Sequence, residues 1–313
     1  MSKVLITGGA GYIGSTLAGM LLERDNEVTV IDNLMYGQSS LTNLCSYKTF
    51  NFIEGDVRDE DLLEEQVKKH DVIIPLAAIV GFPACEKDKE LATAVNYKHV
   101  WNICKWSSPD QKLIYPNTNS GYGVGEGDTL CTEETPLSPI SHYGNTKCNA
   151  EANILSKGGI SLRLATVFGM SPRFRNDLLV NDFVYRAFDD GFIVLFEKHF
   201  KRNFVHVVDV CDAFIYMINN YNKAKGEAYN VGLSSANLSK LELCEKIKEY
   251  VPNFAILSDD INTDPDKRNY IVSSEKIEKL GCKARVSLDD GIQELLKAYP
   301  MIRKVKNSNY TNL

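Results

Sequence analysis

Residues 3–15 read KVLITGGAGYIGS, an apolar run that leads into three glycines spaced three residues apart. The apolar run predicts a buried strand, and the spacing of apolar residues after Gly14 predicts a helix. Gly8, Gly11 and Gly14 therefore stand in a turn between a strand and the N-terminus of a helix. There the backbone can approach a pyrophosphate, and negative charge is favoured. We interpret the stretch as the opening of a dinucleotide-binding unit.

The alternation of strand and helix continues through the first half of the chain. Apolar strands are expected at 27–32, 49–57, 71–78, 112–117 and 160–169, and helices at 15–26, 59–70, 90–107 and 141–158. Strands made of continuous apolar residues indicate a parallel sheet that is covered on both faces. With right-handed crossovers, the pattern predicts an α/β fold with a doubly wound parallel sheet of the Rossmann type.

The regular alternation ends after Gly169, where loop and helix replace it. Strand and helix spacing returns over 203–232, and the remainder of the chain is rich in helical spacing with short extended pieces. We therefore expect a cofactor-binding Rossmann domain and a smaller C-terminal lobe that binds substrate. Their predicted extents are 1–168 with 204–231 for the domain, and 169–203 with 232–313 for the lobe.

Composition argues against several classes of function. A net charge of −6 does not favour nucleic acid as a partner, because nucleic-acid binding usually needs a basic face. The sequence has no signal-peptide layout and no apolar run long enough to span a bilayer, so we expect a cytoplasmic protein without a membrane span. Its eight cysteines form no CxxC pair, and we predict neither disulfides nor a bound metal.

Asp32 closes the second predicted strand, 18 residues after Gly14. A carboxylate in this position can accept hydrogen bonds from both hydroxyls of the adenosine ribose, and its charge would repel a 2′-phosphate. The cofactor that we expect is therefore NAD rather than NADP. The predicted cofactor-binding residues are Gly8, Gly11, Tyr12, Ile13, Gly14, Asp32, Asn33, Asp56, Val57, Leu76, Ala77 and Ala78, together with Tyr143 and Lys147.

Tyr143 and Lys147 are four residues apart in a predicted helix, so they share one face of it. A tyrosine with its ordinary pKa near 10 is a poor base at neutral pH. An adjacent ammonium and the positive nicotinamide ring both stabilise the phenolate and so lower that pKa. On a helix behind a dinucleotide-binding turn, this pair predicts a tyrosine that acts as a general base.

Several short motifs are distributed along the chain, namely TGGAGYIG at 7–14, GDV at 55–57, PLAA at 75–78, YGNTK at 143–147 and RNFVHVVDV at 202–210. Together with Asp32 they resemble the extended short-chain dehydrogenase/reductase family, in its branch of nucleotide-sugar epimerases, dehydratases and dehydrogenases. That family places a Ser or Thr four residues before a Tyr-Gly pair, a position held here by Thr118. The resemblance implies a catalytic triad. Thr118 would hold the substrate oxygen, Tyr143 would take the hydroxyl proton, and Lys147 would assist while hydride passes to NAD.

The loop after Thr118 differs from part of that family. Its 4,6-dehydratases usually place an acid pair directly after the threonine, and its sugar-acid decarboxylases a glutamate, because they break a C–O or C–C bond after oxidation. Here Asn119 and Ser120 follow, and neither side chain transfers protons near neutral pH. We expect both residues to contact the substrate, and dehydration is disfavoured.

A diphosphate substrate is well matched by arginine, whose planar side chain is bidentate and always charged. The resemblance implies that Arg202 and Arg268 stand at positions that contact the substrate phosphates. Arg173 and Asn181 come from the same predicted lobe and are further candidates for substrate binding.

Two other reactive residues receive structural interpretations. Cys85 could act as a base near the sugar, but a packed thiol at a junction between loop and helix is the favoured interpretation. His206 is interpreted as a structural histidine at the domain junction rather than as a catalytic base.

The sequence therefore predicts an enzyme that oxidises the C4 hydroxyl of a nucleotide-linked sugar with NAD. The segments 77–96 and 116–123 most resemble C4 dehydrogenases that act on GDP-linked heptose in bacterial capsule synthesis. A nucleotide-sugar 4-epimerase is the main alternative, and a 4,6-dehydratase or a catalytically silent NAD-binding protein are the others. The family also implies a homodimer, formed by the helices at 88–107 and 141–157.

Overall fold

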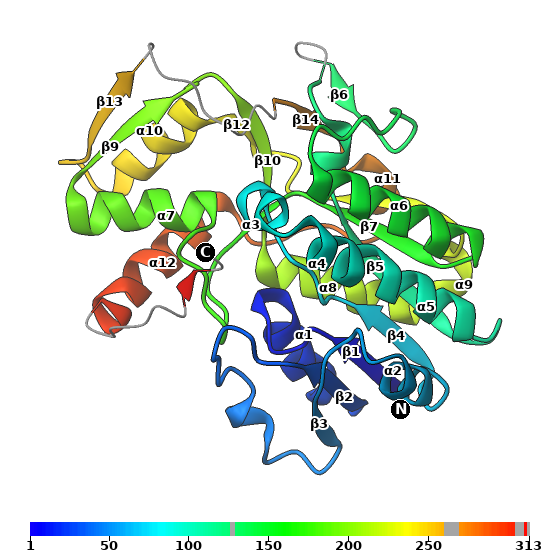
Figure 1. The fold of residues 1–313 in the computed structure, drawn as a ribbon. Helices are drawn as coiled ribbons and strands as arrows, with labels where there is room; N and C mark the ends of the chain where they lie inside the picture. The colour runs from blue at the N-terminus through cyan, green and yellow to red at the C-terminus, as the bar shows by residue number, and fades with distance from the viewer. Residues whose placement is uncertain (126–128, 260–268, 304–309, 312–313) are drawn as a thin grey trace.

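The computed structural model describes residues 1–125, 129–259, 269–303 and 310–311. A sheet of seven parallel strands forms its centre, in the order β11-β7-β5-β4-β1-β2-β3 (Figure 1). The strands are β1 Lys3–Thr7, β2 Glu27–Asp32, β3 Phe50–Glu54, β4 Val72–Pro75, β5 Lys112–Thr118, β7 Ile160–Leu164 and β11 Ala228–Val231. The predicted doubly wound α/β fold is confirmed.

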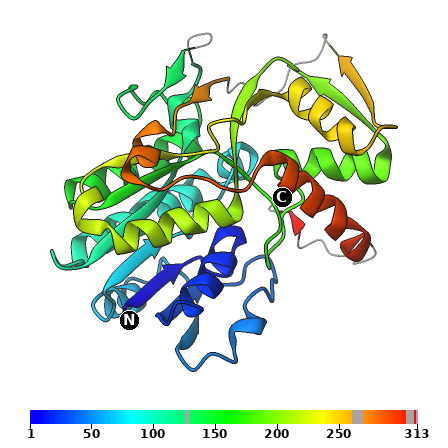
Figure 2. The same cartoon turned by 180° about the vertical axis from the view of Figure 1, so that it is seen from behind.

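Helices cover both faces of this sheet because its strands alternate their apolar side chains between the two. Val4 and Ile6 of β1 pack with α1 (Tyr12–Leu22) and α8 (Val207–Asn219). Leu5 points to the opposite face, where α2 (Glu60–Val67), α5 (His99–Trp106) and α6 (His142–Ser156) lie. Figure 2 shows the face that α1 and α8 cover. In Figure 1 the helices of the other face lie in front.

The helix predicted over 90–107 contains a wider turn. It comprises α4 (Lys89–Thr93), a π-turn over Ala94–Lys98, and α5. Asn96 in the π-turn accepts a hydrogen bond from the backbone nitrogen of Ile79 at 2.8 Å and donates one to the oxygen of Ile79 at 3.0 Å. The π-turn thus holds the segment that follows β4, at one side of the cavity described below.

The prediction of a single strand over 160–169 is wrong in one respect, because this segment forms two strands that belong to different sheets. β7 ends at Leu164, and β8 (Thr166–Phe168) pairs with β10 (Lys201–His206), which pairs in turn with β12 (Asn237–Ser239). The neighbouring strand β11 ends at Val231, whose oxygen accepts the last ladder bond from Ala165. The next residues, Thr166–Phe168, pair with β10 in the small sheet instead.

The C-terminal part of the chain has a hydrophobic core of its own, which includes Phe183, Leu243 and Ile292. Its main elements are α7 Leu179–Tyr185, β9 Phe192–Phe196, α10 Lys240–Tyr250, β13 Ala255–Asp259 and α12 Leu288–Ile302. This second core supports the division that we propose, with 1–168 and 204–231 as the cofactor domain and 169–203 and 232–313 as the smaller lobe. The strands β8 and β10, which flank the proposed boundaries, pair with each other between the two units.

The remaining short elements are the 3-10 turns Thr42–Leu44 and Asn119–Tyr122, the π-turn Arg186–Asp190, α3 Phe82–Lys87, α9 Tyr221–Ala224, α11 Glu275–Leu280, β6 Leu130–Cys131 and β14 Ile271–Val272. Among the described residues, no helix combines the length and the apolar character needed to cross a membrane.

Candidate active site

A cavity of about 1030 Å³ opens at the carboxyl ends of the central strands and extends to the smaller lobe. Residues that follow β1, β2, β3, β4 and β5 line it, and the segment from Arg173 to Asp182 contributes from the other side. In doubly wound sheets, ligands bind at this edge because the loops there converge around the N-termini of helices. The cavity therefore lies where the glycine turn predicts a dinucleotide.

The glycine turn packs closely against the end of β4. Gly8 has a φ of +72°, and a Cβ atom on it would lie 2.6 Å from the Cα atom of Ala77. A Cβ atom on Gly14 would lie 2.6 Å from the Cα atom of Gly9. Only glycine fits such contacts, so the turn brings bare backbone to the cavity, as binding of a pyrophosphate requires.

Asp32 lies at the carboxyl end of β2, lines the cavity and is 9% exposed. Its Oδ2 atom accepts a hydrogen bond from the backbone nitrogen of Ala10 at 2.9 Å, and its Oδ1 atom accepts one from that of Leu34 at 2.9 Å. Burial raises the pKa of Asp32, and these two amide bonds counteract part of the shift. The carboxylate is thus fixed between the glycine turn and the next loop, where it lines the cavity.

Asp56 lies at the same end of the cavity and forms an ion pair with Arg58, with 2.8 Å between Oδ2 and Nη2. The hydrogen bond from Arg58 lowers the pKa of Asp56 to about 2. Asn33 donates a hydrogen bond from Nδ2 to Oδ2 of Asp56 at 3.2 Å, which joins the loops that follow β2 and β3. All of the predicted cofactor residues line this one cavity, namely Gly8, Gly11, Tyr12, Ile13, Gly14, Asp32, Asn33, Asp56, Val57, Leu76, Ala77, Ala78, Tyr143 and Lys147.

Tyr12 has a second role that its sequence position does not predict. Its hydroxyl donates a hydrogen bond to the backbone oxygen of Gly169 at 2.7 Å, and its side chain is buried. Gly169 belongs to the connection into the smaller lobe, so Tyr12 ties the glycine turn to that lobe.

The three predicted catalytic residues also line the cavity. Thr118 is the last residue of β5, and its Oγ1 atom accepts a hydrogen bond from the backbone nitrogen of Ser120 at 3.1 Å. Tyr143 and Lys147 lie one turn apart on α6. Lys147 is 4% exposed, and burial lowers the pKa of its ammonium to about 7.

Of the two residues after Thr118 that are predicted to contact the substrate, one lines the cavity. Ser120 lines it. Asn119 is 1% exposed and does not line it, because the 3-10 turn that begins at Asn119 directs this side chain into the protein. The predicted contact of Asn119 with substrate is therefore not supported by the geometry.

Asn181 is a second such case. It is fully buried, does not line the cavity, and accepts a hydrogen bond on Oδ1 from the backbone nitrogen of Gly169 at 3.0 Å. Its Nδ2 atom donates to the backbone oxygen of Arg175 at 2.8 Å. Asn181 is therefore committed to the backbone of the connection between domain and lobe rather than to a ligand.

The predicted arginines are placed differently from one another. Arg173 lines the cavity, and its guanidinium carbon lies 5.3 Å from the centre of the Tyr36 ring. Arg202 is 4% exposed, lies 5.6 Å from the centre of the Tyr270 ring and does not line the cavity. Arg268 lies outside the described residues.

The cavity contains residues that sequence reasoning missed. Tyr36, Arg175 and Asp177 line it, and Arg175 donates a hydrogen bond from Nε to Oδ1 of Asp177 at 3.0 Å. Arg175 is only two residues from Arg173, which is a signal that could have identified it. Tyr36 lies in the loop after β2, and no sequence pattern connects it to the segment around Arg175.

The structural interpretations of Cys85 and His206 are confirmed. Cys85 is fully buried, its Sγ atom donates to the backbone oxygen of Ile79 at 3.1 Å, and burial raises its pKa to about 11. His206 caps the N-terminus of α8, and its Nε2 atom lies 2.6 Å from Oε2 of Glu294 in α12. This histidine therefore joins the small sheet to the smaller lobe.

Comparison with known proteins gives a family for this chain. Residues 4–232 match the model of the NAD dependent epimerase/dehydratase family. The chain is 28% identical over 310 residues to low-salt glycan biosynthesis protein Agl12 of Haloferax volcanii, covering 95% of this chain and 98% of that protein. It is 27% identical over 325 residues to dTDP-glucose 4,6-dehydratase of Streptomyces niveus, covering 95% and 92%.

Among solved structures, the fold is similar to that of UDP-glucuronic acid 4-epimerase of Bacillus cereus in complex with UDP-glucuronic acid and NAD. The TM-score is 0.84 at 24% identity, and the match covers 96% of this chain and 99% of that one. The family match extends over most of the chain and includes the glycine turn, Asp32, Thr118, Tyr143 and Lys147. The chain belongs to the NAD dependent epimerase/dehydratase family, and the prediction of NAD as its cofactor is confirmed.

Proposed function

We propose that the protein oxidises the C4 hydroxyl of a nucleotide-linked sugar to a 4-keto sugar, with NAD as the acceptor. The observation that carries this proposal is the placement of Thr118, Tyr143 and Lys147 in one cavity with the glycine turn and Asp32. The names of the relatives support nucleotide-linked sugars as the class of substrate.

Each catalytic residue has a distinct task in this proposal. Tyr143 takes the proton of the sugar hydroxyl as a general base, and the Lys147 ammonium stabilises the phenolate. The Thr118 hydroxyl holds the substrate oxygen in line with this transfer. When NAD is bound, it supplies the acceptor for the hydride that leaves the same carbon.

The acidic residues of the cavity argue against dehydration. Among the described residues that line it, the carboxylates are Asp32, Asp56, Asp177 and Asp182. Asp56 pairs with Arg58, Asp177 with Arg175, and Asp182 with Arg186. None of the four comes from the loop after Thr118, where elimination would need an acid beside the tyrosine.

The sugar and its nucleotide are proposed from resemblance. GDP-linked heptose, converted in capsule synthesis, is the substrate that the segments 77–96 and 116–123 favour. Arg173 at the cavity supports a diphosphate, since guanidinium groups bind phosphate oxygens in pairs. A cytoplasmic location and a homodimer belong to the same proposal.

A 4-epimerase is the second candidate. It would use the same three residues and return the hydride to the opposite face of a 4-keto sugar that has turned within the cavity. The comparison with an epimerase of the same fold supports it.

Incubation with GDP-, UDP-, CDP- and dTDP-linked sugars distinguishes the candidates. A dehydrogenase yields NADH and a product lighter by two hydrogens in mass spectrometry. An epimerase yields neither, but NMR shows an inverted stereocentre. Tyr143→Phe must abolish either reaction, and unchanged turnover in this variant would refute the proposed chemistry.

A further inference from the structure

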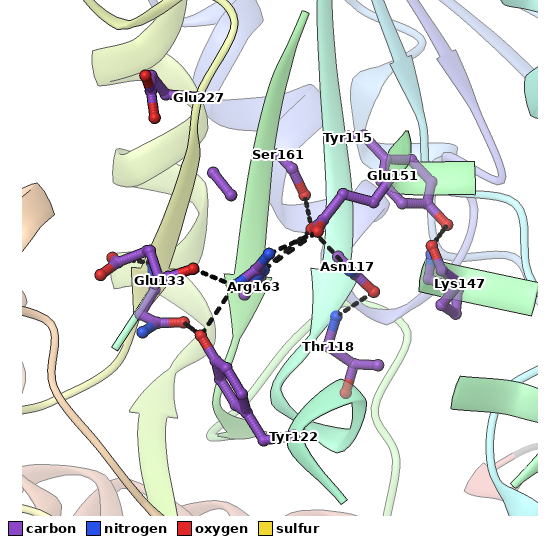
Figure 3. A network of polar contacts seen from close by, with 12 residues as sticks. Tyr115, Asn117, Thr118, Tyr122, Glu133, Lys147, Glu151, Ser161, Arg163 and Glu227 are labelled. Carbon is purple, nitrogen blue, oxygen red and sulfur yellow. Dashed lines mark hydrogen bonds and ion pairs between the residues drawn. The ribbon is translucent and has the colours of Figure 1, made fainter. Parts of the chain in front are cut away.

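A buried ion pair lies close to the 3-10 turn Asn119–Tyr122, which follows Thr118. Glu151 of α6 and Arg163 of β7 are 2% and 6% exposed, with 2.7 Å between Oε1 and Nη2 (Figure 3). Burial raises the pKa of Glu151, but the hydrogen bonds and the charge of Arg163 outweigh it, so that the pKa lies below its usual value. The carboxylate is thus ionised and can only accept hydrogen bonds.

This requirement determines the orientation of the Asn117 amide. The Nδ2 atom of Asn117 donates to Oε2 of Glu151 at 2.7 Å, because the carboxylate needs a donor there. The Oδ1 atom of Asn117 is then directed the other way and accepts from the backbone nitrogen of Thr118 at 2.8 Å. A chain of two hydrogen bonds therefore connects Glu151 to the residue that carries the catalytic hydroxyl (Figure 3).

Arg163 holds the other end of the same loop. Its Nη1 atom donates to the hydroxyl oxygen of Tyr122 at 3.1 Å, and that hydroxyl donates to Oδ1 of Asn230 at 2.7 Å. Thr118 and Tyr122 delimit the 3-10 turn that follows β5. The ion pair consequently anchors both ends of the turn.

Glu151 also belongs to the helix that carries the proposed base. Tyr143, Lys147 and Glu151 are spaced four residues apart on α6, which places them along one face over two turns. Tyr143 lies on α6 and Thr118 on β5. Glu151, which is held by Arg163, therefore links this helix to this strand through its hydrogen bond with Asn117.

We propose that Glu151, Arg163 and Asn117 are positioning residues that hold the Thr118 hydroxyl in register with Tyr143. This inference rests on the proposed function. A purely structural role is the competing explanation. Buried ion pairs are often replaced by apolar residues without loss of stability, so the pair's presence alone does not indicate what it does.

Glu151→Gln tests the orientation of Asn117. A glutamine must direct its amino group toward either Arg163 or Asn117, and in the second case the Asn117 amide turns and opposes the Thr118 N–H with its own donors. We expect kcat to fall about 100-fold, since a displacement near 1 Å at a catalytic group costs that much. The dissociation constant for NAD should change much less than kcat, because the glycine turn and Asp32 take no part in this network.

Asn117→Ala separates position from stability. It removes both hydrogen bonds of the chain and leaves the Glu151–Arg163 pair in place, so kcat should fall about as far, to roughly 1%. The melting temperature should fall only modestly, because Glu151 keeps its hydrogen bonds with Arg163 and Ser161. Ile154→Ala is the matched control on α6. Ile154 is fully buried in the core beneath the sheet, so its truncation lowers the melting temperature and leaves kcat unchanged at temperatures where the variant is folded.

The outcomes are distinct. Wild-type kcat in both Glu151→Gln and Asn117→Ala would overturn the inference, while loss of turnover in Tyr143→Phe would still uphold the proposed function. If kcat falls in all three variants, Ile154→Ala included, and only in proportion to the loss of melting temperature, the network has a structural role and the inference is refuted. Crystal structures of Glu151→Gln and Asn117→Ala provide a test that does not depend on turnover. Thr118 in its wild-type position in both would also refute the inference.

Discussion

The Nζ atom of Lys147 lies 4.1 Å from the centre of the Tyr115 ring, which belongs to the strand that leads to Thr118. The face of the ring attracts the ammonium, an interaction that is worth about 2 kcal/mol where water is excluded. Burial nevertheless disfavours the charge and lowers the pKa of Lys147 to about 7. When Lys147 is charged, the protein therefore carries a buried ammonium one helical turn from Tyr143 at a cost in stability.

That cost should depend on pH. The pKa of Lys147 in the folded protein is about 7, below the ordinary value of 10.5, so the unfolded chain binds more protons between these two values. The destabilisation is present in full below the folded pKa and is lost as the pH rises toward the unfolded one. Lys147→Met in nucleotide-free protein should raise the melting temperature at about pH 6, and the gain should vanish near pH 10. Lys157→Met, at the exposed residue that follows the same helix, should show no such trend.

Gly8→Ala should destabilise the protein and abolish NAD binding. The substitution adds a Cβ atom 2.6 Å from the backbone of Ala77 and places alanine at a φ of +72°. Gly158 is a matched control, since its φ is +74° and nothing lies within 4 Å of its Cβ position. Gly158→Ala should therefore cost only the backbone strain of about 1–2 kcal/mol. Equal unfolding free energies for the two variants, measured with denaturant, would contradict the close packing of the turn.

Asp32→Asn should weaken NAD and relax discrimination against NADP. Loss of a charged acceptor toward a ribose hydroxyl costs about 1.5–3 kcal/mol, or roughly ten- to a hundredfold in the dissociation constant. The same change removes the repulsion of a 2′-phosphate, so the ratio of the two constants should fall by at least this factor. Asp56→Asn changes a carboxylate that is paired with Arg58 and should leave the ratio intact. Calorimetric titration of both variants decides the matter.

Trp101→Glu should dissociate the proposed homodimer. Trp101 lies on α5, in one of the two helical segments from which the dimer is proposed to form, and its side chain is 46% exposed. Phe192→Glu, on a strand of the smaller lobe where the side chain is 51% exposed, should leave the assembly unchanged. Light scattering after gel filtration distinguishes the masses. A dimer that survives Trp101→Glu but not Phe192→Glu would place the interface on the smaller lobe instead.

Prediction from sequence worked best where spacing along one element determines direction. The period of a helix places Tyr143 and Lys147 on one face, and the end of the apolar run places Asp32 at the carboxyl end of its strand. The structure brings these residues to one cavity as expected. Asn119, Asn181 and Arg202 are predicted to bind substrate from their positions in a loop or a motif. None of the three lines the cavity. Each instead has its side chain buried, and the packing of its own segment determines where that side chain points.

The sequence by itself determined the parallel sheet, the glycine turn, the choice of NAD and the shared helix face of Tyr143 and Lys147, because local periodicity and charge specify each of them. Only the tertiary structure decided that Tyr12 is bonded to Gly169, that Tyr36 and Arg173 meet across the cavity, and that Glu151 and Arg163 lie behind Thr118. These relationships join residues of different elements. They depend on how the elements pack, which no short stretch of sequence encodes.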